Sequence, residues 1–487
     1  MDHAADPIAG VRLHGQRTLK DLPGPRGLPL LGNLLQLDIK RAHTILERWA
    51  EEYGDFYRLR LVRTDVVAIS APTLIDQILK DRPGRFTRIG IMRDAFLDTG
   101  INGVFSAEGA DWRRQRKLVM QALNTDHLRK YFDRLDQVAA RLQRRWQRAA
   151  RDGAPIDVQS DLKRFTVDVT SGLAFGADLN TLEDEGDVIQ HILDKIFPVM
   201  ARRTLAPFRY WRWLRWGADR KVDAAMQKLL GVVQNLVSSA RAPVSGASCP
   251  RQAPSNLLEA MVAASSDETA AFTDAEIVGN ILTIFLAGED TTANTLAWMM
   301  HLMAQHPEVQ RQMQAEADRV LGSAERAPTY DSTADLRYVE AMAQETMRLL
   351  PVAPLQGAEP IEETLIGDVW VPKGTPIYML AGRAAKLAAS FPEPLALNPE
   401  RWLNGGHHAS EGHHPHAFFP FGGGPRVCPG RQLALLEIKV VAAMLGRNFE
   451  VVRPSGAPQP VEVFSFTMMP GNLSLLLRER PRSATPH

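Results

Sequence analysis

A cysteine inside a glycine-rich run is the residue of this sequence best suited to chemistry. The run Phe421–Gly430 reads FGGGPRVCPG, and Cys428 lies just before a predicted helix. Backbone amide hydrogens of the turn and the helix start are expected to point at the sulfur, which would lower its pKa and favour the thiolate. Gly422, Gly424 and Gly430 would allow tight turns and let the backbone lie flat against a ligand. The run therefore predicts a platform for a metal-bound sulfur.

Three other interpretations of this run are a phosphate-binding loop, a redox cysteine and a cysteine buried for packing. A phosphate loop of the GxxxxGK[ST] type needs a lysine and a hydroxyl that the run lacks. A redox cysteine of the CxxC type needs a partner, and none is present. Packing alone does not explain three glycines and an arginine around one sulfur.

A second group of polar residues, Ala287–Thr292, lies in the middle of a long apolar segment. A capping box at Thr273–Glu276 predicts the start of a helix that nothing interrupts before Pro307. Polar side chains inside a buried helix cost about 1 to 3 kcal/mol each unless they are hydrogen-bonded or useful. Gly288 would let a large flat body approach the helix, and Thr291 can bond back to a carbonyl. Taken alone, this pattern fits a kinked structural helix equally well.

Helical periodicity dominates the elements that must position these residues. Helices are predicted at Arg113–Ala122, Leu128–Arg151 and Asp187–Met200, and strands at Phe56–Leu61, Val66–Ser70, Val369–Val371 and Leu473–Leu477. The predicted fold class is mainly α with a small β portion. Two further segments are predicted to be loops, a Ser/Ala/Pro-rich stretch at Ser238–Ser255 and a histidine-rich stretch at Asn404–His416. The second also fits a metal-binding tract, but its histidines lack regular ligand spacing.

Composition excludes several classes of protein. The 487 residues carry 57 Lys and Arg against 56 Asp and Glu, a net charge of +1, which argues against nucleic-acid binding. Two cysteines cannot form a disulfide framework and indicate a reducing compartment. No stretch reaches the roughly 18 to 20 apolar residues of a membrane span, so we expect a cytoplasmic protein. Residues 1–22 are predicted to be an N-terminal extension and residues 23–487 a single domain.

The run at Cys428 resembles the FGxGxRxCxG haem-binding loop of the cytochrome P-450 family. Further family motifs follow in the expected order along nearly the whole chain. They are the proline-rich entry Pro23–Pro25, the WxxxR pair Trp112 and Arg116, the AGxDT motif Ala287–Thr291, the ExxR motif Glu345–Arg348 and the PERF/W motif Pro399–Trp402. The resemblance implies the cytochrome P-450 fold, a triangular helical prism around a buried haem b.

The resemblance also implies roles for individual residues. Cys428 would be the proximal ligand of the haem iron and would favour O–O cleavage. Thr291 and Asp290 would form the proton route, with Asp290 relaying protons from solvent. Other residues expected to contact the cofactor are Arg426, Trp112, Arg116, Phe421, Gly422, Gly430 and Ala287. A structural network is implied for Glu345, Arg348 and Arg401, and a substrate pocket for Thr283, Ala287, Val352, Ala353 and Met468.

One departure concerns the segment after Pro354, where many family members place an arginine or histidine aimed at a haem propionate. This chain instead reads Leu355-Gln356-Gly357-Ala358-Glu359. Propionate neutralisation is therefore expected to rest on Arg426, Arg116 and Trp112.

The implied reaction is insertion of one atom of O₂ into a hydrophobic small molecule, as in a soluble bacterial monooxygenase of this family. Electrons would come from a separate ferredoxin or flavodoxin with an NAD(P)H reductase. A basic face is predicted to steer an acidic carrier, and it comprises Arg113, Arg114, Arg116, Lys117, Arg129 and Lys130. A solvated basic helix explains the same residues. The alternatives for the whole protein are a peroxide-driven enzyme or isomerase of the same fold, and a non-catalytic haem sensor or binding protein.

Overall fold

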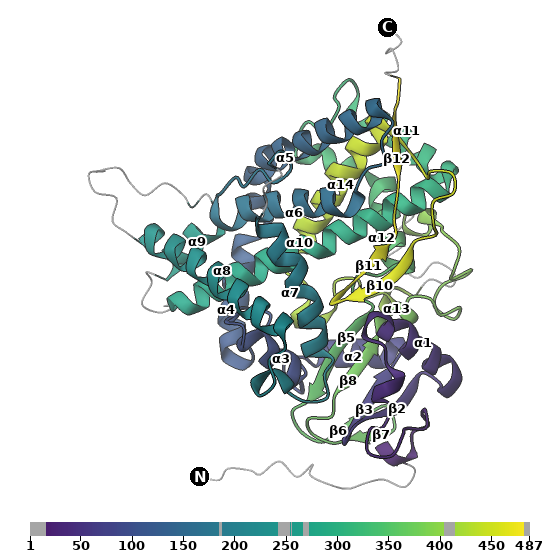
Figure 1. Ribbon diagram of the computed structural model, residues 1–487. Coiled ribbons are helices and arrows are strands. Elements are labelled where there is room, and N and C mark those ends of the chain that lie inside the picture. The colour runs from purple at the N-terminus through teal and green to yellow at the C-terminus, as the bar shows by residue number, and fades with distance from the viewer. Residues whose placement is uncertain are drawn as a thin grey trace, which may run out of the picture.

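The computed structural model describes residues 16–184, 188–241, 254, 256–265, 272–403 and 414–481. Helices make up most of this part of the chain, as predicted (Figure 1). They are α1 (Ala42–Tyr53), α2 (Pro72–Lys80), α3 (Gly90–Leu97), α4 (Gly109–Ala122), α5 (Thr125–Asp152), α6 (Val158–Phe175), α7 (Val188–Thr204), α8 (Gly217–Arg241), α9 (Leu257–Ala264), α10 (Asp274–Gln305), α11 (Pro307–Leu321), α12 (Arg337–Leu349), α13 (Ala381–Ala384) and α14 (Arg431–Asn448).

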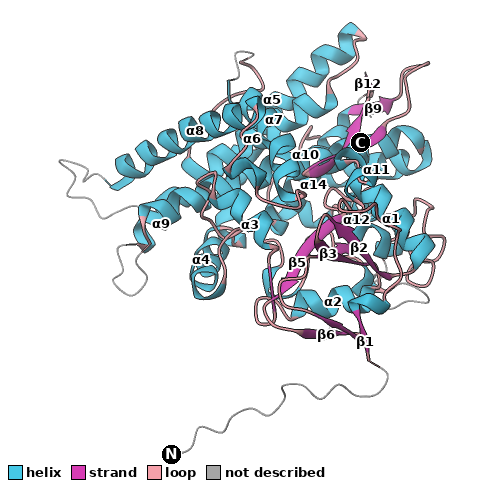
Figure 2. Ribbon diagram, turned by 60° about the horizontal axis from the view of Figure 1, so that its bottom comes forward, coloured by secondary structure: helices cyan, strands magenta, loops and turns pink. Residues whose placement is uncertain are grey.

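The strands of the described residues form a five-stranded sheet, a three-stranded sheet and two antiparallel pairs. The five-stranded sheet has the order β2 (Phe56–Leu61), β3 (Thr64–Ile69), β8 (Ile377–Leu380), β5 (Leu355–Pro360) and β4 (Phe86–Thr87). The three-stranded sheet consists of β1 (Arg17–Thr18), β7 (Val369–Val371) and β6 (Thr364–Ile366). The remaining pairs are β10 (Val461–Ser465) with β11 (Thr467–Gly471), and β12 (Leu476–Glu479) with β9 (Phe449–Val452). Apolar side chains of α2 pack with both larger sheets, and Figure 2 shows α2 between them.

The helix α10 runs through the middle of the molecule, with α6 and α14 beside it (Figure 1). It begins at the predicted capping box: the amide of Glu276 donates to the Thr273 hydroxyl at 3.2 Å, and the amide of Thr273 donates to the Glu276 carboxylate at 2.9 Å. It ends at Gln305, two residues before Pro307 starts α11. The predicted bounds of this helix are confirmed, because both of its termini are fixed by local chemistry.

The short strands are where the sequence was least informative. The predicted strands at 56–61 and 369–371 are confirmed, β3 overlaps the one predicted at 66–70, and β12 shares only residues 476 and 477 with the one predicted at 473–477. β5 was not predicted, because its sequence LQGAEP contains no β-branched residue. It is a strand because it pairs antiparallel with β8, from Leu355 opposite Leu380 to Ala358 opposite Ile377.

The described part of the N-terminal segment belongs to the folded domain. Arg17 and Thr18 pair parallel with Val369 and Trp370, and Leu19 and Leu22 are buried against the same sheet. Residues 17–22 thus pack on the domain that is predicted to begin at residue 23. Residues 1–15 lie outside the described part, as do residues 242–253 and 255 of the predicted linker and 404–413 of the histidine-rich loop. Among the described residues, no helix combines the length and the apolar character that a membrane crossing needs.

Candidate active site

The cysteine-bearing loop is shaped by two glycines and docked on the end of α2. Gly422 and Gly424 have φ of 71° and 62°, the left-handed region that the sequence predicted for them. A Cβ on Gly424 would lie 2.1 Å from the Leu79 carbonyl oxygen, so no other residue fits there. Gly430 differs: its φ is −83°, an ordinary value. The predicted special backbone at Gly430 is therefore wrong, and a Cβ there would instead lie 3.8 Å from the Cys428 sulfur.

The Cys428 side chain is exposed at the start of α14, and its amide is anchored to the Phe421 carbonyl at 2.8 Å. Although this side chain reaches the surface, protein atoms surround much of the thiol, and the resulting desolvation raises its pKa. The amide of Gly430, the charge of Arg116 and the amide of Arg431 favour the thiolate but offset only part of this effect. The prediction of a lowered pKa is therefore wrong for the protein by itself, although the predicted amides do point at the sulfur. A bound metal cation deprotonates a coordinating thiol outright.

Two residues of α4 approach this loop. The Arg426 guanidinium lies over the Trp112 ring, 4.5 Å from its centroid, and Arg116 interacts electrostatically with Cys428. Positions four apart share one face of a helix, which explains why Trp112 and Arg116 both face the loop. Arg426 donates to the Ala107 carbonyl at 3.0 Å and pairs with Glu108, whereas its Nε and Nη1 have no hydrogen-bond partner among the described residues.

The polar motif is the part of the middle of α10 that is accessible to solvent. Residues 277–286 are all buried, but Ala287 is exposed and Thr291, one turn later, is partly exposed. The Thr291 hydroxyl donates to the Ala287 carbonyl at 3.0 Å, as predicted. Gly288 faces another way, because a Cβ there would lie 2.5 Å from Thr170 Cγ2 on α6. The prediction that Gly288 admits a flat ligand is wrong, since its missing side chain admits α6.

Asp290 is buried between α10, α6 and β11. Its carboxylate pairs with Lys163 Nζ at 3.2 Å and accepts a hydrogen bond from the Thr467 hydroxyl. The Lys163 side chain is only 12% exposed and that of Asp290 only 3%. Asp290 therefore reaches the outer layer of the protein through the Lys163 ammonium and not through its own exposure. The sequence did not predict that Lys163 and Thr467 contact Asp290, because both are far from it in the chain.

The predicted structural residues come together in one buried network. Arg348 donates two hydrogen bonds of 2.8 Å to Glu345, and Arg401 donates a third of 3.1 Å to the same carboxylate. Glu345 and Arg348 have fully buried side chains, so the pair is not the surface ion pair that this spacing usually forms.

An apolar cavity lies beside the exposed part of α10. Thr283 and Ala287 line it, as predicted, and the other lining residues are Phe96, Ile101, Phe105, Ile196, Phe197, Met200, Leu286 and Phe466. The four phenylalanines come from three separate parts of the chain.

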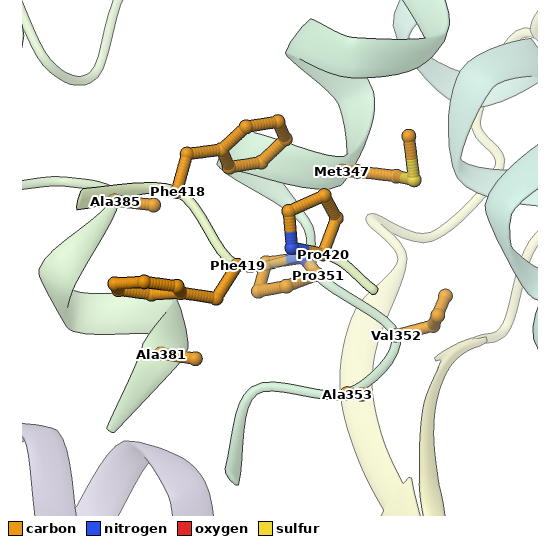
Figure 3. Close-up of a pocket in the computed structure, with 9 residues that line it drawn as sticks. All are labelled: Met347, Pro351, Val352, Ala353, Ala381, Ala385, Phe418, Phe419 and Pro420. Carbon is orange, nitrogen blue, oxygen red and sulfur yellow. The ribbon is translucent and has the colours of Figure 1, made fainter. Parts of the chain in front are cut away.

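The other predicted pocket residues lie elsewhere. Val352 and Ala353 line a second, smaller pocket, where Figure 3 shows them near Pro351 and Pro420. Met468 is only 1% exposed and packs with Val352 and its neighbours, with its amide donating to the Val352 carbonyl at 2.8 Å. The predicted substrate pocket therefore divides into two cavities and a core residue.

Comparison with known proteins identifies the family. The family model described as Cytochrome P450 matches residues 22–477, almost the entire chain. The chain belongs to the cytochrome P450 family. It is a cytochrome P450 monooxygenase with the P450 fold, and its cofactor is haem b.

Similar relatives of this P450 include bacterial and animal proteins. Cyclooctatin synthase from Streptomyces melanosporofaciens is 30% identical over 426 residues, which cover 87% of this chain and 88% of the relative. Cytochrome P450 2B9 from Mus musculus is 27% identical over 461 residues, which cover 93% of this chain and 91% of the relative. The crystal structure of a cytochrome P450, CYP102L1, superposes with a TM-score of 0.81 at 25% identity and covers 94% of this chain and 99% of that one. The crystal structure of the cytochrome P450DA haem domain superposes with a TM-score of 0.83 at 24% identity and covers 94% of this chain and 98% of that one. At this identity the likeness shows the fold alone.

The residues of this P450 fit haem b. The accessible Cys428 sulfur would be a suitable ligand for the iron, and the Arg426 N–H groups that have no partner among the described residues could donate to a carboxylate. Ala287 offers an accessible small apolar surface on α10. This combination of a soft ligand, cationic donors and an apolar wall matches the iron, the propionates and the porphyrin face.

Proposed function

We propose that this P450 monooxygenase acts on a neutral, hydrocarbon-rich small molecule and takes electrons from an acidic ferredoxin or flavodoxin with an NAD(P)H reductase. Haem b, when bound, supplies the chemistry that places one atom of O₂ into substrate and releases the other as water. The single observation that carries the substrate class is the cavity beside Ala287, in which nine of the ten lining residues are apolar. Cys428 would hold the iron.

The polar lining residue, Thr283, is already engaged. Its hydroxyl donates to the Gly279 carbonyl at 2.7 Å, and Gly103 packs so closely that a Cβ there would lie 2.1 Å from the Thr283 oxygen. An ionised substrate group would lose its hydration in this cavity without gaining a partner, at a cost of several kcal/mol. One relative, 28% identical over 430 residues, is named cyclooctat-9-en-7-ol 5-monooxygenase, and this name denotes an unsaturated alcohol without an ionised group. It supports the same substrate class.

A matched pair of ligands tests the substrate class. A hydrocarbon-rich unsaturated alcohol is expected to shift the haem from low to high spin at a concentration at least tenfold lower than the corresponding carboxylate does at pH 8. The complete system of NAD(P)H, reductase and ferredoxin should then give a product with one added oxygen atom. Equal or tighter binding of the carboxylate would contradict the proposal. Comparable turnover with peroxide alone would favour the peroxide-driven alternative.

The proposed proton route runs from Lys163 through Asp290 to Thr291. The Lys163 ammonium holds the buried Asp290 carboxylate in place, and Asp290 precedes Thr291 on the same helix. Thr291 presents a hydroxyl that can accept and donate hydrogen bonds beside the exposed Ala287. We assign Thr291 the task of holding the oxygen to be protonated and Asp290 the task of resupplying the proton.

Thr291→Ala is expected to keep its haem but to divert reducing equivalents into hydrogen peroxide, because the proton donor at the reacting oxygen is lost. Product formed per NAD(P)H should fall at least twofold, and peroxide should rise correspondingly. Thr295→Ala is the matched control, since Thr295 lies one turn further along α10 and its hydroxyl donates to the Thr291 carbonyl at 2.9 Å. If both variants stay fully coupled, Thr291 has no part in the route.

The proposed docking face for the electron carrier is smaller than the sequence suggested. Arg114 bonds to Glu276 on α10 and to Asp111, and Arg129 bonds to Asp331 at 2.7 Å, so these charges are already compensated. Arg113 and Lys117 are exposed on α4, the helix that places Arg116 near Cys428. These two exposed cations are the ones that best fit an acidic partner.

Reversing both charges, Arg113→Glu with Lys117→Glu, is expected to slow reduction by an acidic ferredoxin about tenfold at low ionic strength. The effect should shrink at high salt, where charges are screened within a few ångströms. Stopped-flow reduction under carbon monoxide measures the rate. Arg220→Glu, an exposed residue of α8, is the control and should leave the rate unchanged. A salt-independent loss, or an equal loss in the control, would remove this face from the interaction.

A further inference from the structure

In the segment after Pro354, many family members carry a propionate-binding arginine. This chain has the uncharged Gln356 there, and its side chain contacts another part of the protein. Gln356 on β5 donates from Nε2 to the Phe419 carbonyl at 3.0 Å, which ties β5 to the segment before the cysteine loop. Glu359, further along, accepts from the amide of Gly90 at 2.9 Å. Residues 355–359 therefore supply no cation, and the charge that a haem propionate needs must come from another element.

A cluster of arginines lies close to the cysteine loop. Burial, followed by the nearby Arg426 guanidinium, lowers the pKa of Arg82 to about 10. Burial also lowers the pKa of Arg88 well below its ordinary value, and Arg82 and Arg426 add to that effect. Glu108 is the carboxylate that offsets this charge: it pairs with Arg426 and accepts from the amide of Arg88 at 3.1 Å. Glu108 is thus the carboxylate that favours the charged form of three buried or half-buried arginines, and Arg426 is the one whose guanidinium pairs with it directly.

Arg82, like Arg426, has hydrogen-bonding capacity left over among the described residues. It is only 6% exposed, yet its Nε and Nη2 have no hydrogen-bond partner among the described residues. Arg88 is different, because its Nε donates to the Phe105 carbonyl at 2.8 Å and its guanidinium lies 3.6 Å from the centroid of the Phe105 ring. Buried cations without partners are rare and costly, so the unpaired side of Arg82 indicates an anionic ligand.

The location of Arg82 matches such a ligand. It follows α2 by two residues, and the end of α2 touches the loop that carries Arg426 and Cys428, with the Leu79 carbonyl packed against Gly424. Arg426 leaves its own Nε and Nη1 unpaired in the same cluster. Carboxylates fit guanidinium groups in paired hydrogen bonds.

We propose that Arg82 binds a haem propionate together with Arg426, and so takes the place of the arginine that is absent after Pro354. The proposal rests on haem b as the cofactor and is independent of the substrate and the electron carrier. Arg82 is a cofactor-positioning residue, because it contacts the edge of the haem rather than the reacting oxygen.

Transfer of haem to excess apomyoglobin tests the proposal without any turnover. Wild-type and Arg82→Gln proteins are each loaded with ferric protohaem and, separately, with its dimethyl ester, which has the same iron and ring but no propionate charge. Arg82→Gln should release protohaem about tenfold faster than wild type, equivalent to about 1.4 kcal/mol. The ester should leave both proteins at rates within twofold of each other. Arg82→Lys should fall between wild type and Arg82→Gln for protohaem.

The control variant is Arg85→Gln, three residues further along the same segment. Arg85 is exposed, and its closest carboxylate is 3.9 Å away in Asp81, so its haem release should match wild type. Equal acceleration of both haems in Arg82→Gln would show a merely structural role, and no acceleration of either would show no role. If Arg82→Gln takes up no haem, the test rests on Arg82→Lys. This variant should release protohaem faster than wild type and the dimethyl ester at the wild-type rate, and any other result overturns the proposal.

Discussion

Replacing Cys428 with serine is expected to abolish the red-shifted carbon monoxide absorption of the reduced protein. That band requires an anionic sulfur on the iron, and a serine oxygen at the same position neither ionises as readily nor donates as much electron density. The loop itself should survive, because the amide of residue 428 would still donate to the Phe421 carbonyl. Activity with NAD(P)H and the redox partners should fall below detection.

The same substitution at the second cysteine provides the control. Cys249 lies outside the described residues, and Cys249→Ser should retain the red-shifted band at full intensity. The haem content of each variant, measured separately as the pyridine haemochrome, distinguishes loss of the ligand from loss of the cofactor. A Cys428→Ser protein that kept the band would remove Cys428 from the role of iron ligand.

The features that the sequence predicted well are those fixed by local chemistry. The capping box at Thr273 and the proline at 307 set both ends of α10, and these constraints involve only neighbours in the chain. The positive φ of Gly422 and Gly424 follows in the same way from their place in a tight loop. Such features can be predicted because the residues that determine them are adjacent in sequence.

The features that the sequence did not reveal depend on contacts between distant segments. Lys163 meets Asp290 across 127 positions, and only the packing of α6 on α10 brings them together. That packing also explains Gly288, whose missing side chain admits Thr170 rather than a ligand. The Cys428 pKa was misjudged for a related reason: the amides near the sulfur are local, whereas the burial that outweighs them comes from the whole fold.

A second large effect is expected from Glu345→Gln, which leaves shape nearly unchanged but removes one buried negative charge. The Glu345 carboxylate accepts hydrogen bonds from the Asn398 amide at 3.0 Å and the Trp402 indole at 2.9 Å, in addition to those from Arg348 and Arg401. The Arg348 side chain is fully buried and that of Arg401 nearly so, at 7% exposure. Both guanidinium groups would lose their counter-ion in the variant.

The expected cost is about 3 to 5 kcal/mol, as found when one partner of a buried ion pair is removed. This is a large share of the roughly 5 to 15 kcal/mol that stabilises a typical domain. Urea unfolding of the haem-loaded protein, followed by far-UV circular dichroism and by the Soret band, measures it.

Glu340→Gln on the same helix is the matched control, because Glu340 is 37% exposed and pairs with Lys439 at 2.5 Å near the surface. Its cost should stay below about 1 kcal/mol. Equal losses in the two variants would show that burial of the Glu345 network contributes nothing beyond an ordinary surface pair. A large loss in Glu345→Gln alone would show that the network joining α12 to the 398–402 segment helps to hold the haem-side core together.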